Sequence, residues 1–270
     1  MTRPGSRPGI KSPLRVGFLI ALGAALVLAD AAPLSAQGRR GRGGGADDQF
    51  ARFNTEYDGR FTFVRLRFTP LIDRFGGGRD LKWDHDYPTA ERNFVKILDE
   101  VTTLQPYLDG GNILAMDDPE LFKYPVAYMS EPGFWTMTDA ERENLRTYVL
   151  KGGFIIFDDF ATWHWSNFEI QLQELLPGAV LVRLDATHPI FDSFFRIESL
   201  NFIHPNQGVP SEFYGVFEDN DPDKRLLLIA NYNNDIGDYW EWSDTGYIPI
   251  EISNEAYKLG VNYIIYAMTH

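Results

Sequence analysis

The segment over residues 152–165 restricts the fold of this chain more than any other part of the sequence. Two glycines are followed by four apolar residues, then by Asp158 and Asp159, and then by a histidine between two tryptophans. A short apolar run bounded by glycine is typical of a strand buried on both faces, as in a parallel sheet. Ligands of such sheets bind beyond the carboxyl ends of the strands, so this acidic pair marks an expected ligand-binding edge.

Strand and helix patterns alternate from Phe61 to the end of the chain. Strands are predicted at 61–68, 112–116, 126–129, 154–157, 180–184, 213–217 and 226–230. Helices are predicted at 88–104, 138–151, near 168–176 and at 255–268, and the last is apolar enough to require burial between layers. This alternation predicts an α/β fold with three layers, in which helices cover both faces of a mostly parallel sheet.

The first 36 residues have the pattern of a secretory signal peptide. Four basic residues precede an apolar run at 16–29, and small residues follow as far as Ala36. The run is about 14 residues long, whereas a membrane-spanning helix needs roughly 20. We therefore expect export to the periplasm or the extracellular space, with cleavage near Ala36 or, as an alternative, near Ala31, and no membrane span afterwards. An uncleaved anchor is the other alternative.

After the signal peptide we expect a flexible Arg/Gly-rich linker at 37–58 and a single domain at 59–270. The chain contains no cysteine, which excludes a lipid anchor on cysteine, disulfides and a thiolate nucleophile. The formal net charge of −13 becomes about −16 once the signal peptide is removed. An acidic domain of this kind disfavours nucleic acids and anionic membrane surfaces as partners.

Asp158, Asp159 and His164 are the candidate metal ligands. Two carboxylates and a histidine can hold a divalent cation, the one cofactor that the sequence suggests, or can divide acid and base roles between them. Trp163 and Trp165 flank the histidine and join the candidate ligand-binding residues. The alternative is structural, with one aspartate capping the next helix and the other exposed to solvent.

A second acidic segment rich in tryptophan follows the last predicted strand, at 231–242. Its candidate ligand-binding residues are Asp235, Asp238, Trp240 and Trp242. In an extended segment Trp240 and Trp242 point the same way and can stack on a sugar ring, whereas the alternative places them in the core. Asp86, just before the first predicted helix, is a further candidate, and its alternative role is to start that helix.

Several motifs in one order resemble a known family. They are Asp86-Tyr87-Pro88, Tyr124-Pro125, Gly152-Gly153 with Asp158-Asp159, His188-Pro189-Ile190, 234–238 and 259–267. Over about Phe61 to His270 the chain resembles the bacterial domain of unknown function family 4159. The resemblance implies an exported or membrane-tethered protein with a flavodoxin-like fold of the class I glutamine amidotransferase type, and no established biochemical role. Those amidotransferases use a cysteine nucleophile, so their thiol chemistry is excluded here.

Two functions from different classes fit this sequence. The first is an exported, non-catalytic domain that binds a polar ligand, a glycan or an envelope protein at the sheet edge. The second is a cysteine-independent, metal-dependent hydrolase that acts on a carbohydrate or cell-wall substrate. The sequence has no phosphate loop, dinucleotide fingerprint, zinc-protease helix or G-x-S-x-G motif, which favours the first. Convergence of Asp158, Asp159 and His164 with Asp235 or Asp238 in one cleft would favour the second.

Overall fold

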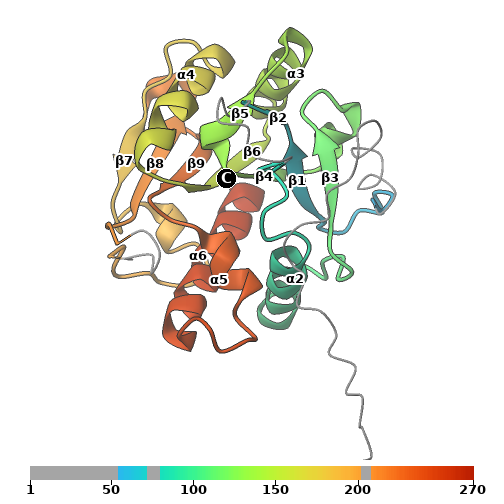
Figure 1. The fold of residues 1–270 in the computed structure, drawn as a ribbon, viewed down its shortest axis with the longest axis vertical. Coiled ribbons are helices and arrows are strands. Elements are labelled where there is room, and N and C mark those ends of the chain that lie inside the picture. Colours follow the sequence, from blue (N-terminus) through green and yellow to red (C-terminus); the bar gives the residue numbers. More distant parts are fainter. Residues whose placement is uncertain (1–53, 72–79, 202–207) are drawn as a thin grey trace, which may run out of the picture. The chain divides into compact units, whose positions relative to one another are not determined.

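The computed structural model describes residues 54–71, 80–201 and 208–270 (Figure 1). They belong to one compact unit, Arg40–His270. The predicted signal peptide and all but the last five residues of the predicted linker lie outside the described residues. In the described ranges, no helix has both the length and the apolar composition needed to cross a membrane.

Helices and strands alternate along the described chain as predicted. The strands are β1 (Phe63–Arg67), β2 (Thr69–Pro70), β3 (Gly111–Ala115), β4 (Val126–Ser130), β5 (Trp135–Thr136), β6 (Phe154–Phe160), β7 (Val182–Leu184), β8 (Glu212–Phe217) and β9 (Leu226–Tyr232). The α-helices are α2 (Thr89–Val101), α3 (Asp139–Leu150), α4 (Trp165–Leu175), α5 (Ile236–Glu241) and α6 (Ile250–Thr269). Helix α4 begins three residues earlier than predicted, and α6 begins five residues earlier.

Seven strands form one sheet in the order β3-β1-β4-β6-β9-β8-β7. Each neighbouring pair from β3 to β9 is parallel, while β8 is antiparallel to both β9 and β7. The prediction of an α/β fold with a mostly parallel sheet is thus confirmed. From β1 the chain moves to β3 on one side and then returns to β4 on the other. The carboxyl ends of β1 and β4 are therefore adjacent where strand order reverses, a common place for ligands.

The two faces of the sheet bury separate apolar clusters, because successive side chains of a strand point to opposite faces. On β1, Phe63 joins the cluster under α2, α5 and α6, whereas Val64 and Leu66 join the cluster under α3 and α4. Figure 1 shows these two sets of helices on opposite sides of the sheet. The three predicted layers are therefore present.

The residues that start and end the helix before β6 have the roles that the sequence predicts. Thr138 and Glu141 form a capping box at the start of α3, in which the Glu141 amide donates to Thr138 Oγ1 at 3.2 Å and the Thr138 amide donates to Glu141 Oε2 at 2.7 Å. The helix ends at Leu150, and the Gly153 amide donates to the Tyr148 carbonyl at 2.9 Å. This turn leads the chain directly into β6, the strand that bears Asp158 and Asp159.

Gly260 allows α6 to pack closely against two other helices. A Cβ at this position would lie 2.5 Å from Cε2 of Phe94 on α2 and 2.6 Å from Cζ2 of Trp240 on α5. Both contacts are with rigid aromatic rings, which stack on each other with centroids 4.4 Å apart. A side chain at position 260 would therefore push apart the helices on this face of the sheet.

We expect Gly260→Ala to lower the free energy of unfolding by about 1–3 kcal/mol, since the overpacking outweighs the higher helix propensity of alanine. The control is Asn254→Ala at an exposed position of the same helix, which should change the stability by less than about 0.5 kcal/mol. Urea denaturation of the three proteins measures both effects. A Gly260→Ala protein as stable as the parent would contradict the close packing described here.

Candidate functional site

Arg65 of β1 anchors the segment that enters α2. Its side chain is 1% exposed and forms an ion pair with Glu91 of α2. Its Nη1 donates to the carbonyl oxygens of Trp83 and His85, at 2.9 Å each, and its guanidinium lies 4.9 Å from the centre of the Tyr128 ring. These contacts hold the loop before α2 at the carboxyl end of β1 and so position His85 and the residue after it.

Asp158 is a buried acceptor that joins three elements to β6 directly and a fourth through Asn231. It accepts hydrogen bonds from Tyr128 Oη of β4 and Asn231 Nδ2 of β9, both at 2.9 Å, and from the Gly237 amide of α5 at 3.1 Å. Tyr263 of α6 donates to Asn231 Oδ1 at 2.9 Å. Burial raises the pKa of Asp158 to about 6, although these hydrogen bonds act in the opposite direction. Because both carboxylate oxygens already accept hydrogen bonds, Asp158 supports the site rather than offering it an open ligand.

His85, Glu131 and Asp159 form a first cluster, which we call the histidine group; their ligand atoms lie within 4.8 Å of one another. His85 Nδ1 is 2.6 Å from Glu131 Oε1 and 3.8 Å from Asp159 Oδ2, while His85 Nε2 is 2.9 Å from Asp80 Oδ1. Burial alone would lower the pKa of His85, but the hydrogen bond and charge of Glu131, with the charge of Asp159, raise it to about 10. Without a bound cation, this histidine is therefore protonated at neutral pH.

Asp86, Asp235 and Asp238 form a second cluster, the aspartate group, whose ligand atoms also lie within 4.8 Å of one another. Asp235 Oδ1 accepts a hydrogen bond from the Asp238 amide at 2.9 Å and so caps α5. Among the described residues, no lysine, arginine or histidine forms an ion pair with Asp86 or Asp235, and the buried Oδ2 of Asp86 has no hydrogen-bond partner. A buried acceptor without a partner is costly, so this group is electrostatically incomplete.

The two groups belong to one edge of the sheet. Burial first, and then the charges of Asp159 and Asp238, raise the pKa of Asp86 well above its ordinary value. Burial and the charges of Asp159 and Asp86 do the same to Asp235. Since Asp159 of the histidine group acts on two carboxylates of the aspartate group, the groups lie within electrostatic reach of each other. Next to Asp235, the side-chain amide of Asn234 is buried, and neither its Oδ1 nor its Nδ2 has a hydrogen-bond partner in the described part of the chain.

The structure brings the predicted acidic residues together and leaves the predicted histidine outside. Asp86, Asp159, Asp235 and Asp238 meet at the edge. His164 enters neither group, because its Nδ1 accepts from the Ala161 amide at 3.3 Å and its ring packs on Phe134 at 4.7 Å. The histidine at the site is instead His85, and Glu131 is a further ligand candidate that the sequence did not single out. The sequence signal for both residues was their position: His85 stands shortly before the predicted helix at 88–104, and Glu131 stands shortly after the predicted strand at 126–129.

The four predicted tryptophans have different environments. The expectation that Trp240 and Trp242 stand on an extended segment is wrong, because residues 236–241 form α5. Trp240 is 1% exposed and stacks on Phe94, so it offers no face to a ligand. Trp165 starts α4 and packs against tyrosines of β8 and β9. Trp163 is 68% exposed and contacts Phe134, so it alone of the four presents a large open face.

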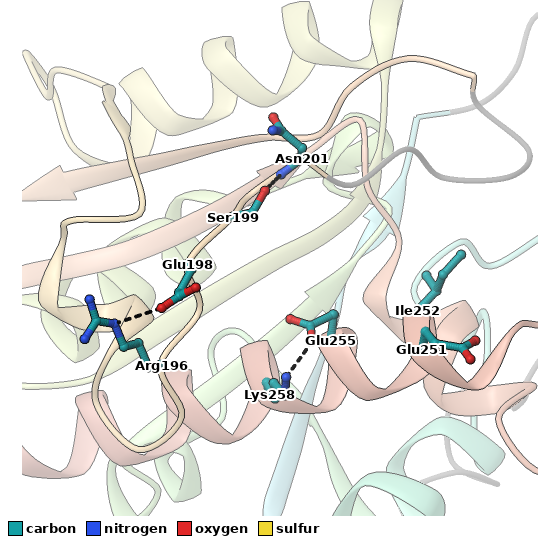
Figure 2. Close-up of a pocket in the computed structure, with 8 residues that line it drawn as sticks. All are labelled: Arg196, Glu198, Ser199, Asn201, Glu251, Ile252, Glu255 and Lys258. Carbon is teal, nitrogen blue, oxygen red and sulfur yellow. Dashed lines mark hydrogen bonds and ion pairs between the residues drawn. The ribbon is translucent and has the colours of Figure 1, made fainter.

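A hollow elsewhere on the molecule contains none of these residues (Figure 2). It is lined by Arg196, Glu198, Ser199, Asn201, Glu251, Ile252, Glu255 and Lys258. Within it Arg196 pairs with Glu198 at 3.6 Å, and Lys258 pairs with Glu255 at 2.5 Å. Its basic side chains are thus balanced by acidic neighbours, whereas the unpartnered Oδ2 of Asp86 lies at the sheet edge.

Comparison with known proteins confirms the resemblance found in the sequence. A family model described as domain of unknown function (DUF4159) matches residues 62–268, a range that includes every member of the histidine and aspartate groups. No protein with curated annotation matches the chain.

We expect the metal-free protein to lose stability as the pH rises from about 5 to about 10. The pKa of Asp158 is 3.8 in the unfolded chain and about 6 in the folded protein, so its proton favours folding at low pH and this effect is lost as the pH rises through 6. The pKa of His85 goes from 6.5 to about 10, so its contribution is complete below 6.5 and lost as the pH rises through 10. Both groups therefore contribute less to the free energy of unfolding as the pH rises.

Urea denaturation in the presence of a chelator, at intervals across this pH range, measures the trend. His85→Gln should reduce the loss of stability above about pH 7, because the variant lacks the titrating imidazole. A stability that increases with pH across the range would contradict the electrostatic arrangement of the site.

Proposed function

The chain belongs to the DUF4159 family, and we propose that it binds a divalent cation at the carboxyl edge of its sheet and, through this cation, a polar ligand. The aspartate group supplies the protein ligands. The main support is Asp86, whose buried Oδ2 lacks a hydrogen-bond partner and whose carboxylate offers a ligand atom within 4.8 Å of ligand atoms from Asp235 and Asp238. A cation among these oxygens satisfies the orphan acceptor and removes the repulsion between crowded carboxylates.

The chemistry of the aspartate group favours a hard cation. Carboxylate oxygens are preferred ligands of Ca²⁺ and Mg²⁺, and Ca²⁺ takes six to eight oxygens at about 2.3–2.6 Å. Three aspartates fill only part of such a coordination shell. The remaining positions are open to water and to oxygens of a bound molecule, such as neighbouring hydroxyl groups or a carboxylate. We therefore expect ligand binding to depend on the cation.

The scaffold supports a site at this edge. The five parallel strands stand in the order second, first, third, fourth and fifth along the chain, which is the flavodoxin-like order, and we propose that the fold is of this class and of the class I glutamine amidotransferase type. Ligands of flavodoxin-like sheets bind where the first and third strands meet. Here these strands are β1 and β4. Arg65 of β1 holds His85, and with it Asp86, at the end of β1. Glu131 directly follows β4.

A cation-dependent hydrolase acting on a carbohydrate or cell-wall substrate is the second candidate. It is favoured by His85, whose Nδ1 lies 3.8 Å from Asp159 Oδ2 beside the aspartate group. A histidine near a cation-bound water can exchange protons during hydrolysis. Trp163, exposed on the turn after β6, offers an aromatic face on which a sugar ring can stack.

We also propose that the protein acts outside the cytoplasm, on a glycan or an envelope protein. The basic residues, apolar run and small residues of the first 36 positions support export. The acidic composition of the domain agrees with a polar, non-nucleic-acid ligand.

Thermal unfolding tests the cation site. We expect Ca²⁺, Mg²⁺ or Mn²⁺ to raise the melting temperature of the protein by about 5–10 °C at a concentration near one hundred times the dissociation constant. Asp235→Asn should abolish the shift produced by Ca²⁺ or Mg²⁺, because it removes one charged ligand while asparagine can still cap α5. Asp223→Asn makes the same charge change at an exposed turn before β9 and should keep the full shift. No shift in the parent protein with any of these ions or with Zn²⁺ would refute the proposal.

Assays on cell-wall and plant polysaccharides separate the two candidates. For the hydrolase, we expect release of reducing ends that stops on chelation and falls at least 100-fold in His85→Gln. Trp163→Ala should weaken polysaccharide binding, measured by affinity electrophoresis, without changing the cation-induced shift. Cation-dependent binding with no product from any polysaccharide would leave the binding function and reject the glycan hydrolase.

A further inference from the structure

We propose that the histidine group (His85, Glu131 and Asp159) holds a second divalent cation, so that the sheet edge contains a two-cation centre. This inference rests on the proposed function, in which the aspartate group holds the first cation. The two groups are linked through the chain, because His85 and Asp86 are consecutive residues and each contributes to a different group. They are also linked in space, because Asp158, next to Asp159 on β6, accepts a hydrogen bond at 3.1 Å from the amide of Gly237, which stands between Asp235 and Asp238.

The ligand atoms of the histidine group come from three separate elements and face one another. His85 lies in the loop before α2, Glu131 follows β4 and Asp159 belongs to β6. His85 Nδ1 lies 2.6 Å from Glu131 Oε1 and 3.8 Å from Asp159 Oδ2. Atoms at such separations can reach a single ion at the usual bond lengths of about 2.0–2.6 Å after small side-chain movements.

Residues outside the group contact His85 and Glu131, two of its three ligands. His85 Nε2 lies 2.9 Å from Asp80 Oδ1, and this carboxylate leaves Nδ1 directed at the other two ligands. The ammonium of Lys82 lies 3.2 Å from Glu131 Oε2 and donates to Glu131 Oε1 at 3.4 Å. Metal-binding histidines almost always donate their other ring N–H to a carboxylate or carbonyl, which fixes the ring and the tautomer. The Asp80–His85 pair has this arrangement.

Unsatisfied polar groups in and next to the neighbouring aspartate group point to a missing bound species at this edge. Asp86 Oδ2 is buried without a partner one residue after His85, and the amide of Asn234, 1% exposed, lacks partners for both polar atoms among the described residues. The support residues nearby differ, since Asp158 and Asn231 are fully engaged. At this edge, the residues of the supporting network are thus paired, whereas Asp86 Oδ2 and the Asn234 side chain are not.

The two groups differ in the cations they favour. An imidazole with two carboxylates suits Zn²⁺, Mn²⁺ or Fe²⁺, whereas three carboxylates suit Ca²⁺, Mg²⁺ or Mn²⁺. Mn²⁺ is therefore the probe that both groups accept. Two cations about 3.5–4 Å apart can hold both the attacking and the leaving oxygen in a displacement, so a filled pair would fit the hydrolase better than simple ligand binding, with His85 then a cation ligand and not the proton carrier.

The test is the number of Mn²⁺ ions bound to the full chain, prepared with chelator and then equilibrated with Mn²⁺. We expect two ions per chain by elemental analysis and a spin-coupled signal by electron paramagnetic resonance. His85→Gln and Asp235→Asn should each bind one ion and show the uncoupled six-line spectrum. His188→Gln, a histidine change at a distant helix cap, should keep two ions. Circular dichroism checks folding, and Asp159→Asn serves as a second variant of the histidine group.

The outcomes distinguish this inference from the proposed function. A single ion in the parent protein that His85→Gln and Asp159→Asn retain would overturn the second cation and leave the proposed function intact. A single ion that is lost in His85→Gln and retained in Asp235→Asn would place it in the histidine group and overturn the proposed aspartate site. No bound ion in the parent protein would overturn both.

Discussion

The burial of Arg65 is the constraint on which the edge of the sheet depends. A guanidinium that is 1% exposed is costly unless it is paired and hydrogen-bonded, and here Glu91 and two backbone carbonyls satisfy it. The carbonyls belong to the loop before α2, so the need to satisfy one charge fixes the path of that loop. His85 and Asp86 reach the end of β1 as a consequence, and both groups of candidate ligands depend on them.

Satisfied and unsatisfied polar groups have separate roles at this edge. Asp158 accepts from Tyr128, Asn231 and Gly237, and this network ties the strands to α5 and α6. A buried network with every member paired adds rigidity and a unique geometry. Asp86 Oδ2 stands beside it without a partner, and such exceptions are rare in folded proteins. The rigid network supports the place where partners are missing, as expected of a preorganised binding site.

Hydrophobic periodicity and the glycine and capping signals predicted the strands of the main sheet, the helices α2, α3, α4 and α6, and the edge at which the acids meet, because these depend on local signals such as the capping box at Thr138. The partner of Asp159 could not be predicted in this way. His164 is near in sequence, but His85 is brought to the site by a contact with Arg65 on another strand. The error at Trp240 had a local cause, since Asp235 is the N-cap of α5 and the segment was interpreted as extended.

Gly237 shows how the supporting network and the site are linked. A Cβ at this position would lie 2.5 Å from Asp86 Oδ2 and 2.9 Å from Tyr128 Oη, so only glycine lets α5 approach the sheet this closely. The same approach brings the Gly237 amide to Asp158 and carries Asp235 and Asp238 to Asp86. The backbone contact that completes the buried network therefore also assembles the aspartate group. A cation bound there would hold α5 to the loop before α2, and cation binding and the packing of α5 should be coupled.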